Sequence, residues 1–209
     1  MKDKSNISAA SLKRMPQYLR VLKEKQKQEV EFISSATIAK DLMLNPIQVR
    51  KDLAFVSESD GKPGVGFEVK ELIKNLEDFL GMKKSVDAIV VGAGRLGHAL
   101  LNYNGFENNI NILAAFDLCD DKCDNDKVFN VSEMESIIKK NNIDIGIIAV
   151  PRKEAQKVCD QLVNYGIKAI WNFAPTHIKV PDDVVLKNED LSASLSILLK
   201  MLENKSNNN

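Results

Sequence analysis

The chain is poor in the side chains from which disulfide frameworks and many catalytic sites are built. Among its 209 residues are two histidines, three cysteines and one tryptophan, and aromatic residues make up only 6%. Cys119, Cys123 and Cys159 are odd in number and too few for a disulfide framework, which favours a reducing, cytoplasmic setting. No set of neighbouring ligands for a metal ion is evident, so no metal site is expected.

The sequence also lacks long apolar runs and any net charge. No stretch approaches the roughly 18 apolar residues of a membrane span, and the first 17 residues lack the apolar core of a secretory signal. The charge is unevenly distributed. Residues 1–84 hold 16 Lys and Arg against 12 Asp and Glu, whereas residues 85–209 hold 13 against 17. A basic first segment is compatible with nucleic-acid binding, although chance alone often produces an excess of this size.

Apolar periodicity divides the first 84 residues into helical segments. Spacings of three and four predict an amphipathic helix over residues 12–28, capped by Ser11. Pro16 falls within this pattern, which favours a regular helix that begins there. A further amphipathic pattern predicts a helix over residues 69–80, and Gly81 is a suitable residue to end it.

Between these two helices lies the pattern of a helix-turn-helix. Helices are expected over residues 34–44 and 46–56, because Asn45 is a good N-cap and Pro46 fits the first helical position. The Gly-rich residues 57–67 predict either a β-hairpin wing or a linker. The candidate DNA-binding residues are Gln48, Arg50 and Lys51 on the second helix and Lys62 in the Gly-rich stretch. Plain helical packing is the alternative explanation of the pattern.

After residue 85, strand and helix patterns alternate. Strands are expected over residues 88–91, 110–116, 143–150 and 167–173, and helices over residues 96–103, 132–140 and 153–165. Continuous apolar strands that alternate with helices predict an α/β fold with a parallel sheet covered on both faces. A leucine-rich helix is expected at the end, over residues 190–203.

The turn after the first of these strands carries the spacing GxGxxG. Gly92 permits a tight turn, Gly94 lets the backbone approach a pyrophosphate, and Gly97 lets helix and strand pack closely. Asp117 ends the next strand, where a carboxylate accepts hydrogen bonds from an adenosine ribose and disfavours a 2′-phosphate. The pattern therefore predicts NAD(H) in preference to NADP(H). A glycine turn without a ligand, or with a CoA-type nucleotide, is the alternative.

Few residues are available to react with such a cofactor. His98 directly follows the glycine turn, His177 lies in a loop and Tyr103 lies at a helix end, where packing or exposure explains each residue better than acid–base catalysis does. The residues beyond the second strand leave no room for a separate substrate domain. We therefore expect a protein that is not an enzyme and assign no catalytic residue.

Taken together and in order, these motifs resemble the Rex family of redox-sensing transcriptional repressors. The resemblance extends from about residue 11 to residue 203. The residues that carry it are Tyr18-Leu19-Arg20, Gln48-Val49-Arg50-Lys51-Asp52-Leu53, Gly64-Val65-Gly66-Phe67, Gly92-Ala93-Gly94-Arg95-Leu96-Gly97, Tyr103-Asn104-Gly105-Phe106, Ala115-Phe116-Asp117, Ala149-Val150-Pro151, Asn172-Phe173-Ala174-Pro175 and Asn188-Glu189-Asp190-Leu191.

The resemblance implies a winged helix-turn-helix DNA-binding domain over residues 1–84 and a Rossmann NAD(H)-binding domain over residues 85–188. A helix and tail over residues 189–209 would be exchanged between the subunits of a homodimer. Family members bind double-stranded operator DNA and release it when NADH binds, in response to a raised NADH/NAD+ ratio. The implied cofactor-binding residues are Gly92, Ala93, Gly94, Arg95, Leu96, Gly97, Ala99, Tyr103, Asp117, Val150, Pro151, Asn172 and Ala174. The implied interdomain coupling residues are Arg20, Tyr103 and Asp190.

Two departures from the family pattern change what the resemblance implies. The wing reads Lys62-Pro63-Gly64-Val65-Gly66-Phe67, where the family commonly has Lys-Arg-Gly-Val-Gly-Tyr, and residues 56–60 lack the usual aromatic-glycine pattern. Leu191 stands where many members have phenylalanine beside the nicotinamide. A different operator preference or a lower DNA affinity, and a weaker discrimination between NADH and NAD+, are expected.

Two other functions compete with the repressor. One is an NAD-dependent oxidoreductase with a helical appendage, and the other is a nucleotide-binding scaffold for a protein partner. Turnover of a small substrate would identify the first, and indifference to substitution of Arg50 and Lys51 would identify the second.

Overall fold

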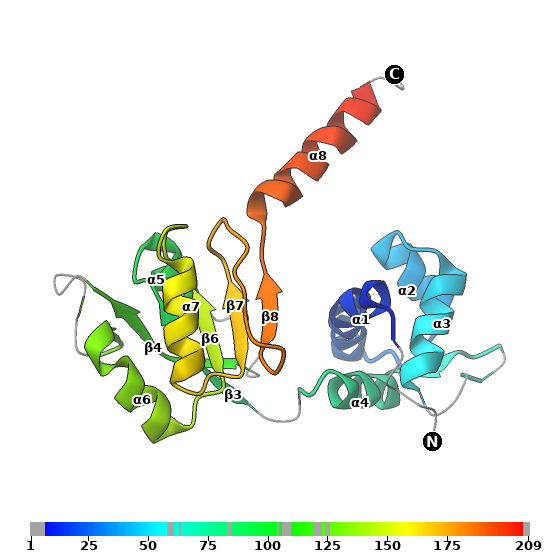
Figure 1. Cartoon of the computed structure of the whole chain (residues 1–209). Helices are drawn as coiled ribbons and strands as arrows, with labels where there is room; N and C mark the ends of the chain where they lie inside the picture. The colour runs from blue at the N-terminus through cyan, green and yellow to red at the C-terminus, as the bar shows by residue number, and fades with distance from the viewer. Residues whose placement is uncertain are drawn as a thin grey trace. The chain divides into compact units, whose positions relative to one another are not determined.

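In the computed structural model the chain divides into two compact units, Met1–Lys84 and Ser85–Asn209. The structure describes residues 7–57, 61–62, 64–82, 85–103, 105, 110–118, 123 and 126–206. Figure 1 shows the helices and strands of both units. Within the described residues, no helix is both long and apolar enough to cross a lipid bilayer.

The first unit is built on the helices α1 (Ala9–Lys27), α2 (Ser35–Leu42), α3 (Pro46–Val56) and α4 (Val69–Phe79). The Ser34 side chain caps α2 by accepting from the Thr37 N–H at 3.0 Å. The Asn45 side chain caps α3 by accepting from the Ile47 N–H at 2.9 Å. Between them, Met43 adopts a left-handed conformation with φ 53°. Helices α2 and α3 therefore form the expected helix-turn-helix.

The start of α1 differs from the prediction. The helix begins at Ala9, and its cap is Ser8, whose side chain accepts from the Ser11 N–H at 3.0 Å. Ser11 is therefore inside the helix, and the helix does not begin at Pro16. Pro16 lies inside α1 at an exposed position, although an interior proline removes one backbone hydrogen bond of a helix.

A short hairpin turn follows α3 and leads into strand β2 (Phe67–Glu68). Strand β2 pairs antiparallel with β1 (Phe32–Ile33), which lies between α1 and α2 in the sequence. Lys62 and Gly66 form a bridge, with N···O distances of 2.8 and 2.9 Å between their backbones. The stretch is therefore a hairpin wing rather than a linker. Residues 58–60 and Pro63 lie outside the described residues, and so does most of the departure noted in the wing sequence.

One apolar core joins the helices of the first unit to its small sheet. Helix α1 contributes Met15, Tyr18 and Leu22, each with no exposed surface. The rest of this core includes Ile33, Ile38, Val49, Leu53, Val56, Phe67, Val69, Leu72 and Leu76. Residues 15–22 of α1 and 69–76 of α4 thus bury the apolar faces that the sequence predicted. Leu12, at the start of the predicted apolar pattern of α1, is instead 44% exposed.

The second unit contains a six-stranded sheet in the order β5-β4-β3-β6-β7-β8, and every neighbouring pair is parallel. The strands are β3 (Val86–Val91), β4 (Ile110–Asp117), β5 (Val128–Asn130), β6 (Ile145–Ile148), β7 (Ala169–Asn172) and β8 (Val185–Asn188). Numbered from β3, this order is that of the dinucleotide-binding Rossmann fold, and it reverses direction between β3 and β6. Ligands of such sheets bind at the carboxyl ends of the strands beside the reversal.

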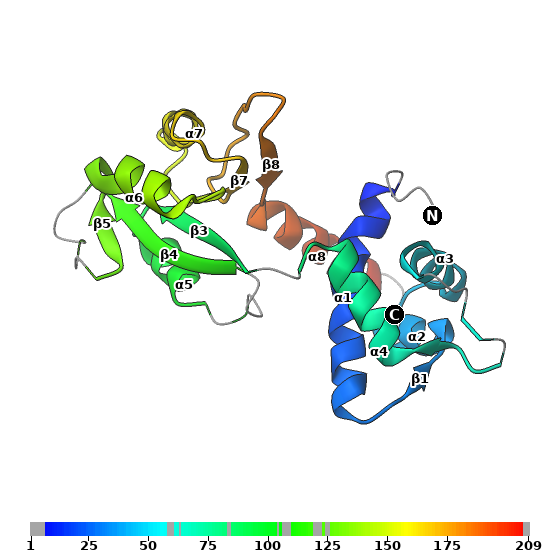
Figure 2. The ribbon, with the colours of Figure 1, turned by 90° about the horizontal axis from the view of Figure 1, so that it is seen from below.

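Helices cover both faces of this sheet, as Figure 2 shows. Ile89 and Val91 of β3 face the core shared with α6 (Met134–Asn141) and α7 (Ala155–Asn164), whereas Ala88 and Val90 face the side of α5 (Arg95–Leu101). Alternate residues of β3 are therefore buried on opposite faces, which explains its continuous apolar sequence.

Four further elements complete the second unit. The edge strands β5 and β8 were not predicted. Each has at most four residues, and the Val185–Asn188 sequence has no clear apolar alternation. A 3₁₀ turn, Val131–Glu133, precedes α6. The last helix, α8 (Leu191–Ser206), is exposed along all its described length.

Candidate functional site

The glycine turn connects the end of β3 to α5 and needs glycine at two positions. Gly92 has φ +103°, and a Cβ atom there would lie 2.5 Å from the Ala149 carbonyl oxygen. A Cβ atom on Gly97 would collide with the Gly92 carbonyl oxygen. Gly94 is different, because a Cβ atom there would meet nothing within 4 Å. Gly92 and Gly97 thus shape the turn, whereas Gly94 keeps open the space in front of it.

Asp117 at the end of β4 holds the turn from the neighbouring strand. Its Oδ2 atom accepts a hydrogen bond from the Ala93 N–H at 2.9 Å. The Gly92 N–H donates to the Phe116 carbonyl at 2.7 Å. The first bond fixes the Asp117 carboxylate next to the glycine turn, and the second joins the backbones of the two strand ends. The sequence predicted a carboxylate at this position, at the end of the strand that follows the turn.

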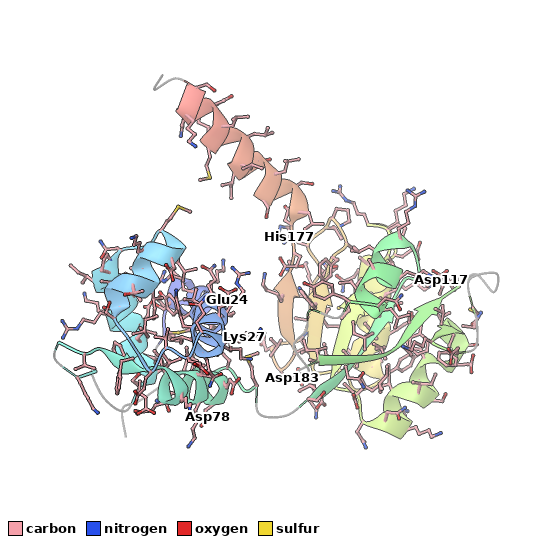
Figure 3. All side chains as sticks on the ribbon, turned by 180° about the vertical axis from the view of Figure 1, so that it is seen from behind. Glu24, Lys27, Asp78, Asp117, His177 and Asp183 are labelled. Carbon is pink, nitrogen blue, oxygen red and sulfur yellow. The ribbon has the colours of Figure 1, made fainter. Side chains whose placement is uncertain are left out.

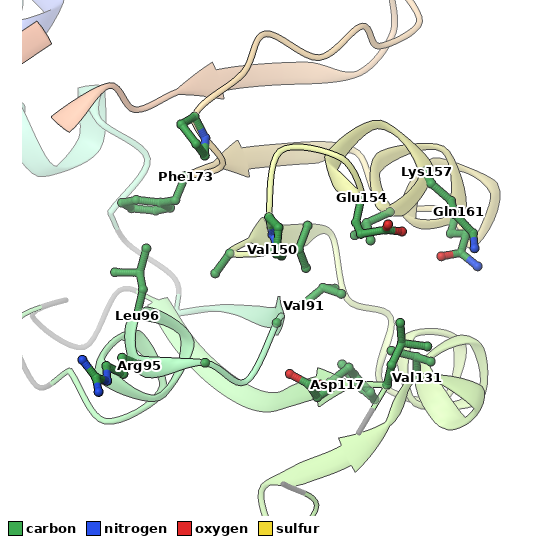
Figure 4. Close-up of a pocket in the computed structure, with 18 residues that line it drawn as sticks. Val91, Arg95, Leu96, Asp117, Val131, Val150, Glu154, Lys157, Gln161 and Phe173 are labelled. Atoms are coloured by element: carbon green, nitrogen blue, oxygen red, sulfur yellow. The ribbon is translucent and has the colours of Figure 1, made fainter. Parts of the chain in front are cut away.

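A cavity of about 700 Å³ opens at this edge of the sheet, a size typical of small-molecule sites. Figure 4 shows Arg95 and Leu96 of α5 on one side. On the other side it shows Lys157 and Gln161 of α7 and the N-cap residue of that helix, Glu154. The remaining lining residues are Val91, Gly92, Gly94, Phe116, Asp117, Leu118, Val131, Ala149, Val150, Pro151, Val158, Phe173 and Pro175. The cavity therefore lies at the reversal of strand order, between β3 and β6.

The predicted cofactor residues fall into two groups. Those that line the cavity are Gly92, Gly94, Arg95, Leu96, Asp117, Val150 and Pro151. Those that do not line it are the buried Ala93, Gly97, Asn172 and Ala174 and the exposed Ala99 and Tyr103. A direct cofactor contact by the second group stays a prediction.

The α7 wall was missed at the sequence level. Glu154, Lys157, Val158 and Gln161 line the cavity at the three- and four-residue spacing of one helix face. The same helix buries Ala155, Cys159 and Leu162. The sequence therefore did contain these residues as the polar edge of an amphipathic helix. It does not reveal that this edge of the helix lines a cavity.

Asn172 is fully buried at the end of β7 and holds the loop that borders the cavity. Its Nδ2 atom donates to the Thr176 carbonyl and to Asn188 Oδ1, both at 2.8 Å. Its Oδ1 atom accepts from the Ala174 N–H at 3.0 Å. Within this arrangement Asn172 fixes the loop that carries Phe173 and Pro175, both of which line the cavity.

The helix-turn-helix presents a polar surface on α3. Gln48, Arg50 and Lys51 are exposed, as the sequence predicted. Arg50 and Lys62 border a hollow of about 530 Å³ between α3 and the wing. The Lys62 ammonium lies 5.3 Å from the centre of the Phe32 ring, a cation–π contact that holds it beside the small sheet. Cationic groups from helix and wing thus border one hollow.

Beneath this surface lies a polar network that the sequence did not reveal. Asp52 of α3 is only 3% exposed, and its Oδ2 atom accepts from Arg14 Nε at 2.8 Å and from the Tyr18 hydroxyl at 2.7 Å. Its Oδ1 atom accepts from Gln48 Nε2 at 2.9 Å. Burial opposes ionisation of Asp52, but these hydrogen bonds outweigh it and hold the pKa of the carboxyl below its ordinary value.

Neither histidine adjoins the cavity. His98 and His177 are exposed and are not among its lining residues, and Figure 3 shows His177 well separated from Asp117. Among the described residues, no group of three or more His, Cys, Asp or Glu is placed to hold a metal ion. Cys119 lies outside the described residues. The cavity thus has the features of a nucleotide site, while neither histidine is placed to react with its occupant.

Comparison with protein-family models gives a match for part of each unit. Residues 6–54 match the model described as a putative DNA-binding protein N-terminus. Residues 83–176 match the model described as a CoA binding domain. The second match covers the glycine turn, Asp117 and most of the cavity, so the family model concerns the same region as the site.

The chain is similar over nearly its whole length to curated proteins. It is 42% identical to the redox-sensing transcriptional repressor Rex of Clostridium beijerinckii, over 97% of this chain and 98% of that protein. It is 43% identical to the redox-sensing transcriptional repressor Rex of Treponema denticola, over 95% of this chain and 96% of that protein.

Solved structures of RSP, a Rex-family repressor, have the same fold. RSP in complex with β-NAD+ and operator DNA gives a TM-score of 0.87 at 39% identity, over 97% of this chain and 95% of that one. RSP in complex with β-NADH gives a TM-score of 0.85 at 38% identity, over 97% of both chains. Both units of the present chain therefore have a counterpart in one solved protein.

Proposed function

The chain belongs to the Rex family of redox-sensing transcriptional repressors, and from this premise we propose that it binds operator DNA as a homodimer and releases it when NADH binds. The observation that carries the proposal is the presence, in one chain, of a cavity at the glycine turn and an exposed helix-turn-helix. The cavity senses the NADH/NAD+ ratio, and the helix-turn-helix is the part that it controls.

NAD(H) suits the cavity better than the alternatives do. Asp117 lies next to the glycine turn, where it accepts hydrogen bonds from the adenosine ribose and repels a 2′-phosphate. The open space at Gly94 admits the pyrophosphate. A CoA-type nucleotide carries a phosphate on its ribose, which the same carboxylate disfavours electrostatically. Titration of the protein with NADH, NADPH and coenzyme A is expected to rank NADH first by at least about tenfold, or about 1.4 kcal/mol.

DNA binding is assigned to α3 and the wing. Arg50 and Lys51 contact guanine edges or phosphates in the major groove, and Lys62 contacts a phosphate or the minor groove. The exposure of all three cations supports this assignment. A repressor works where its operator is, so the proposal places the protein in the cytoplasm.

Dimerisation is assigned to α8. Its apolar residues are between 56% and 66% exposed, namely Leu191, Leu195, Ile197, Leu198, Leu199, Met201 and Leu202. A surface of that kind marks an interaction site. A second copy of the chain is the occupant that the family implies, and its own α8 would be buried in the same way. The resulting dimer presents two copies of α3 to two half-sites.

The coupling between cofactor and DNA is assigned to Arg20, Tyr103 and Asp190. NADH and NAD+ differ in the charge and shape of the nicotinamide. They switch the dimer only to the extent that they bind its two arrangements with different affinity. A tenfold change in DNA affinity requires about 1.4 kcal/mol of coupling.

Substitution of Asp190 tests this coupling. Its Oδ1 atom accepts from the Ala193 N–H at 2.9 Å and so caps α8. Asp190→Ala removes both the cap and the charge, whereas Asp190→Ser keeps a capping oxygen and removes only the charge. Both variants are expected to bind operator DNA with a reduced response to NADH. If the response of Asp190→Ser equals that of the wild type, the charge has no part in the coupling.

The DNA-binding function itself is tested by selection from random duplex DNA with NADH, with NAD+ and with neither. We expect a two-fold symmetric sequence to be enriched in the last two conditions and lost with NADH. Enrichment that ignores both nucleotides would leave a DNA-binding protein with a different effector. No enrichment, together with turnover of a small substrate by the NAD-bound protein, would favour the oxidoreductase instead.

A further inference from the structure

The buried Asp52 carboxylate restricts how an exposed side chain of α3, Gln48, can hydrogen-bond to a DNA base. Gln48 and Asp52 are one helical turn apart on α3, and Gln48 Nε2 donates to Asp52 Oδ1 at 2.9 Å. The other oxygen of Asp52 is held from α1, by Arg14 Nε at 2.8 Å and by the Tyr18 hydroxyl at 2.7 Å. The side chain that faces solvent is thus connected to a fixed group in the interior.

This connection allows only one orientation of the Gln48 amide. An ionised carboxylate accepts hydrogen bonds and cannot donate them. Arg14 places a permanent positive charge against Asp52, which keeps it ionised. If the amide were turned over, its Oε1 atom would face Asp52 Oδ1 at hydrogen-bonding distance, and two acceptors would repel each other. The Nε2 group must therefore point inward.

The outward part of the Gln48 side chain then has a defined chemistry. Gln48 is exposed, and its amide keeps the Oε1 acceptor and one N–H for a ligand. In the major groove, adenine offers an N6 donor beside the N7 acceptor, and cytosine offers an N4 donor. Guanine and thymine present only acceptors there, so that Oε1 would be left without a donor.

We propose that Asp52 is a positioning residue that makes Gln48 select a base with a major-groove donor, adenine first and cytosine second. The proposal rests on the DNA-binding function proposed above and concerns its specificity. Asp52 itself does not contact DNA, because it is buried. Its contribution is to exclude one of the two orientations that the side-chain amide of Gln48 could otherwise adopt toward a base.

Two substitutions test the proposal by selection from random duplex DNA with the full-length protein. Gln48→Met keeps the length of the side chain and removes its hydrogen bonds, and so identifies the base position that Gln48 reads. At that position the wild type is expected to prefer adenine or cytosine over guanine by about 5- to 100-fold. Guanine or thymine there, or no position that depends on Gln48, would overturn the proposal.

Asp52→Asn is expected to invert this preference. Arg14 and Tyr18 donate to the oxygen of the new amide, so its nitrogen turns toward Gln48 and the Gln48 Oε1 atom turns inward. The outward group is then Nε2, which favours guanine or thymine at the same position. Preferences at the other positions are expected to stay. An unchanged preference, or an equal loss at every position, would show that Asp52 has only a structural role.

Two controls complete the design. Asp41→Asn removes the same charge from the first unit, at a residue of α2 that pairs with Lys25 at 3.3 Å, and is expected to leave the base preference unchanged. If circular dichroism shows that Asp52→Asn does not fold, the double variant Arg14→Gln/Asp52→Asn replaces it, because it removes both partners of the ion pair and leaves no unpaired charge. The Tyr18 hydroxyl still donates to the oxygen of the new amide, so the same switch to guanine or thymine is expected, and a persisting donor preference would contradict the inference. Failure of the wild type to enrich any sequence would instead refute the proposed function, and with it this inference.

Discussion

At the scale of single residues, the nucleotide site depends on two positions where a methyl group does not fit. The Cβ of Gly97→Ala would overlap the Gly92 carbonyl oxygen. We expect this variant to lose about 3 kcal/mol of stability in the second unit, from overpacking against backbone, and to lose measurable NADH binding. Denaturant unfolding and a fluorescence titration with NADH measure the two effects.

Gly94→Ala is the matched control. No atom lies within 4 Å of the added Cβ, and the backbone of Gly94 is extended. Its stability is expected to stay near that of the wild type, while NADH affinity falls because the methyl group occupies space intended for the pyrophosphate. Normal NADH binding by Gly97→Ala would contradict the assignment of this turn as the phosphate site.

Two buried acids predict how stability changes in alkali. Burial, reinforced by Asp160, raises the pKa of the Cys159 thiol from 9.0 to about 11. Burial and the hydrogen bond to Asp52 raise the pKa of Tyr18 from 10.0 to about 12. A folded-state pKa above the unfolded one gives a stability that is complete below the unfolded pKa and is lost as pH rises through the folded pKa.

The stability of the second unit is therefore expected to fall between about pH 9 and 11, and that of the first between about pH 10 and 12. Urea midpoints measured across this range test the expectation. Cys159→Ala should flatten the first decline and Tyr18→Phe the second. If either variant keeps the slope of the wild type, the corresponding side chain is not the origin of the decline.

At the scale of secondary-structure elements, the turn of the helix-turn-helix contains a strained residue. Met43 follows α2 with φ 53° and is 94% exposed, so it accepts a left-handed conformation without gaining any packing. Met43→Gly is expected to raise the stability of the first unit by about 1 kcal/mol. Thermal unfolding measures this gain.

Met43→Ala separates strain from the loss of the side chain. Alanine keeps the Cβ atom that disfavours the left-handed region, so its stability should stay near that of the wild type. Equal gains in both variants would assign the effect to the methionine side chain rather than to the backbone.

The elements that the sequence predicted are those with strong local signals. Asn45 and Pro46 gave the start of α3 correctly, and apolar runs gave the central strands β3, β4, β6 and β7. The edge strands β5 and β8 were missed because each is short and has little apolar pattern of its own. Their pairing is decided by the neighbouring strand.

The same limit applies to the site. The spacing from Gly97 to Asp117 predicted a nucleotide turn, because the glycine turn and the carboxylate belong to one continuous strand–helix–strand segment. The α7 wall with Lys157 and Gln161, and the network of Arg14, Tyr18 and Asp52, join residues far apart in sequence. A polar residue on an amphipathic helix does not reveal whether its neighbour in space is water, a cavity or a buried carboxylate.

At the scale of the whole molecule, α8 carries the proposed dimerisation. Replacing Leu195 and Leu198 by Glu places two charges on a helix that the dimer must bury. Each leucine contributes about 1.5–3 kcal/mol when fully buried, so we expect a monomer in sedimentation experiments. The affinity of this variant for a two-fold symmetric operator should also fall, because a monomer cannot bind both half-sites at once.

Lys200→Ala provides the control on the same helix. Lys200 pairs with Glu203 at 2.9 Å at an exposed site, and a surface pair of this kind contributes little. This variant is expected to remain a dimer. A dimeric Leu195→Glu/Leu198→Glu protein would place the interface elsewhere.

The central claim is that one chain couples a nucleotide site to a DNA-binding unit, and thermodynamic reciprocity tests it most directly. The measurement is the Kd for operator DNA with and without saturating NADH, together with the Kd for NADH with and without saturating operator DNA. Coupling requires the two ratios to be equal. We expect NADH to weaken DNA binding at least about tenfold, operator DNA to weaken NADH binding by the same factor, and NAD+ to produce a smaller effect. If the protein binds both ligands and neither Kd changes when the other ligand is present, the two sites are independent and the account is contradicted.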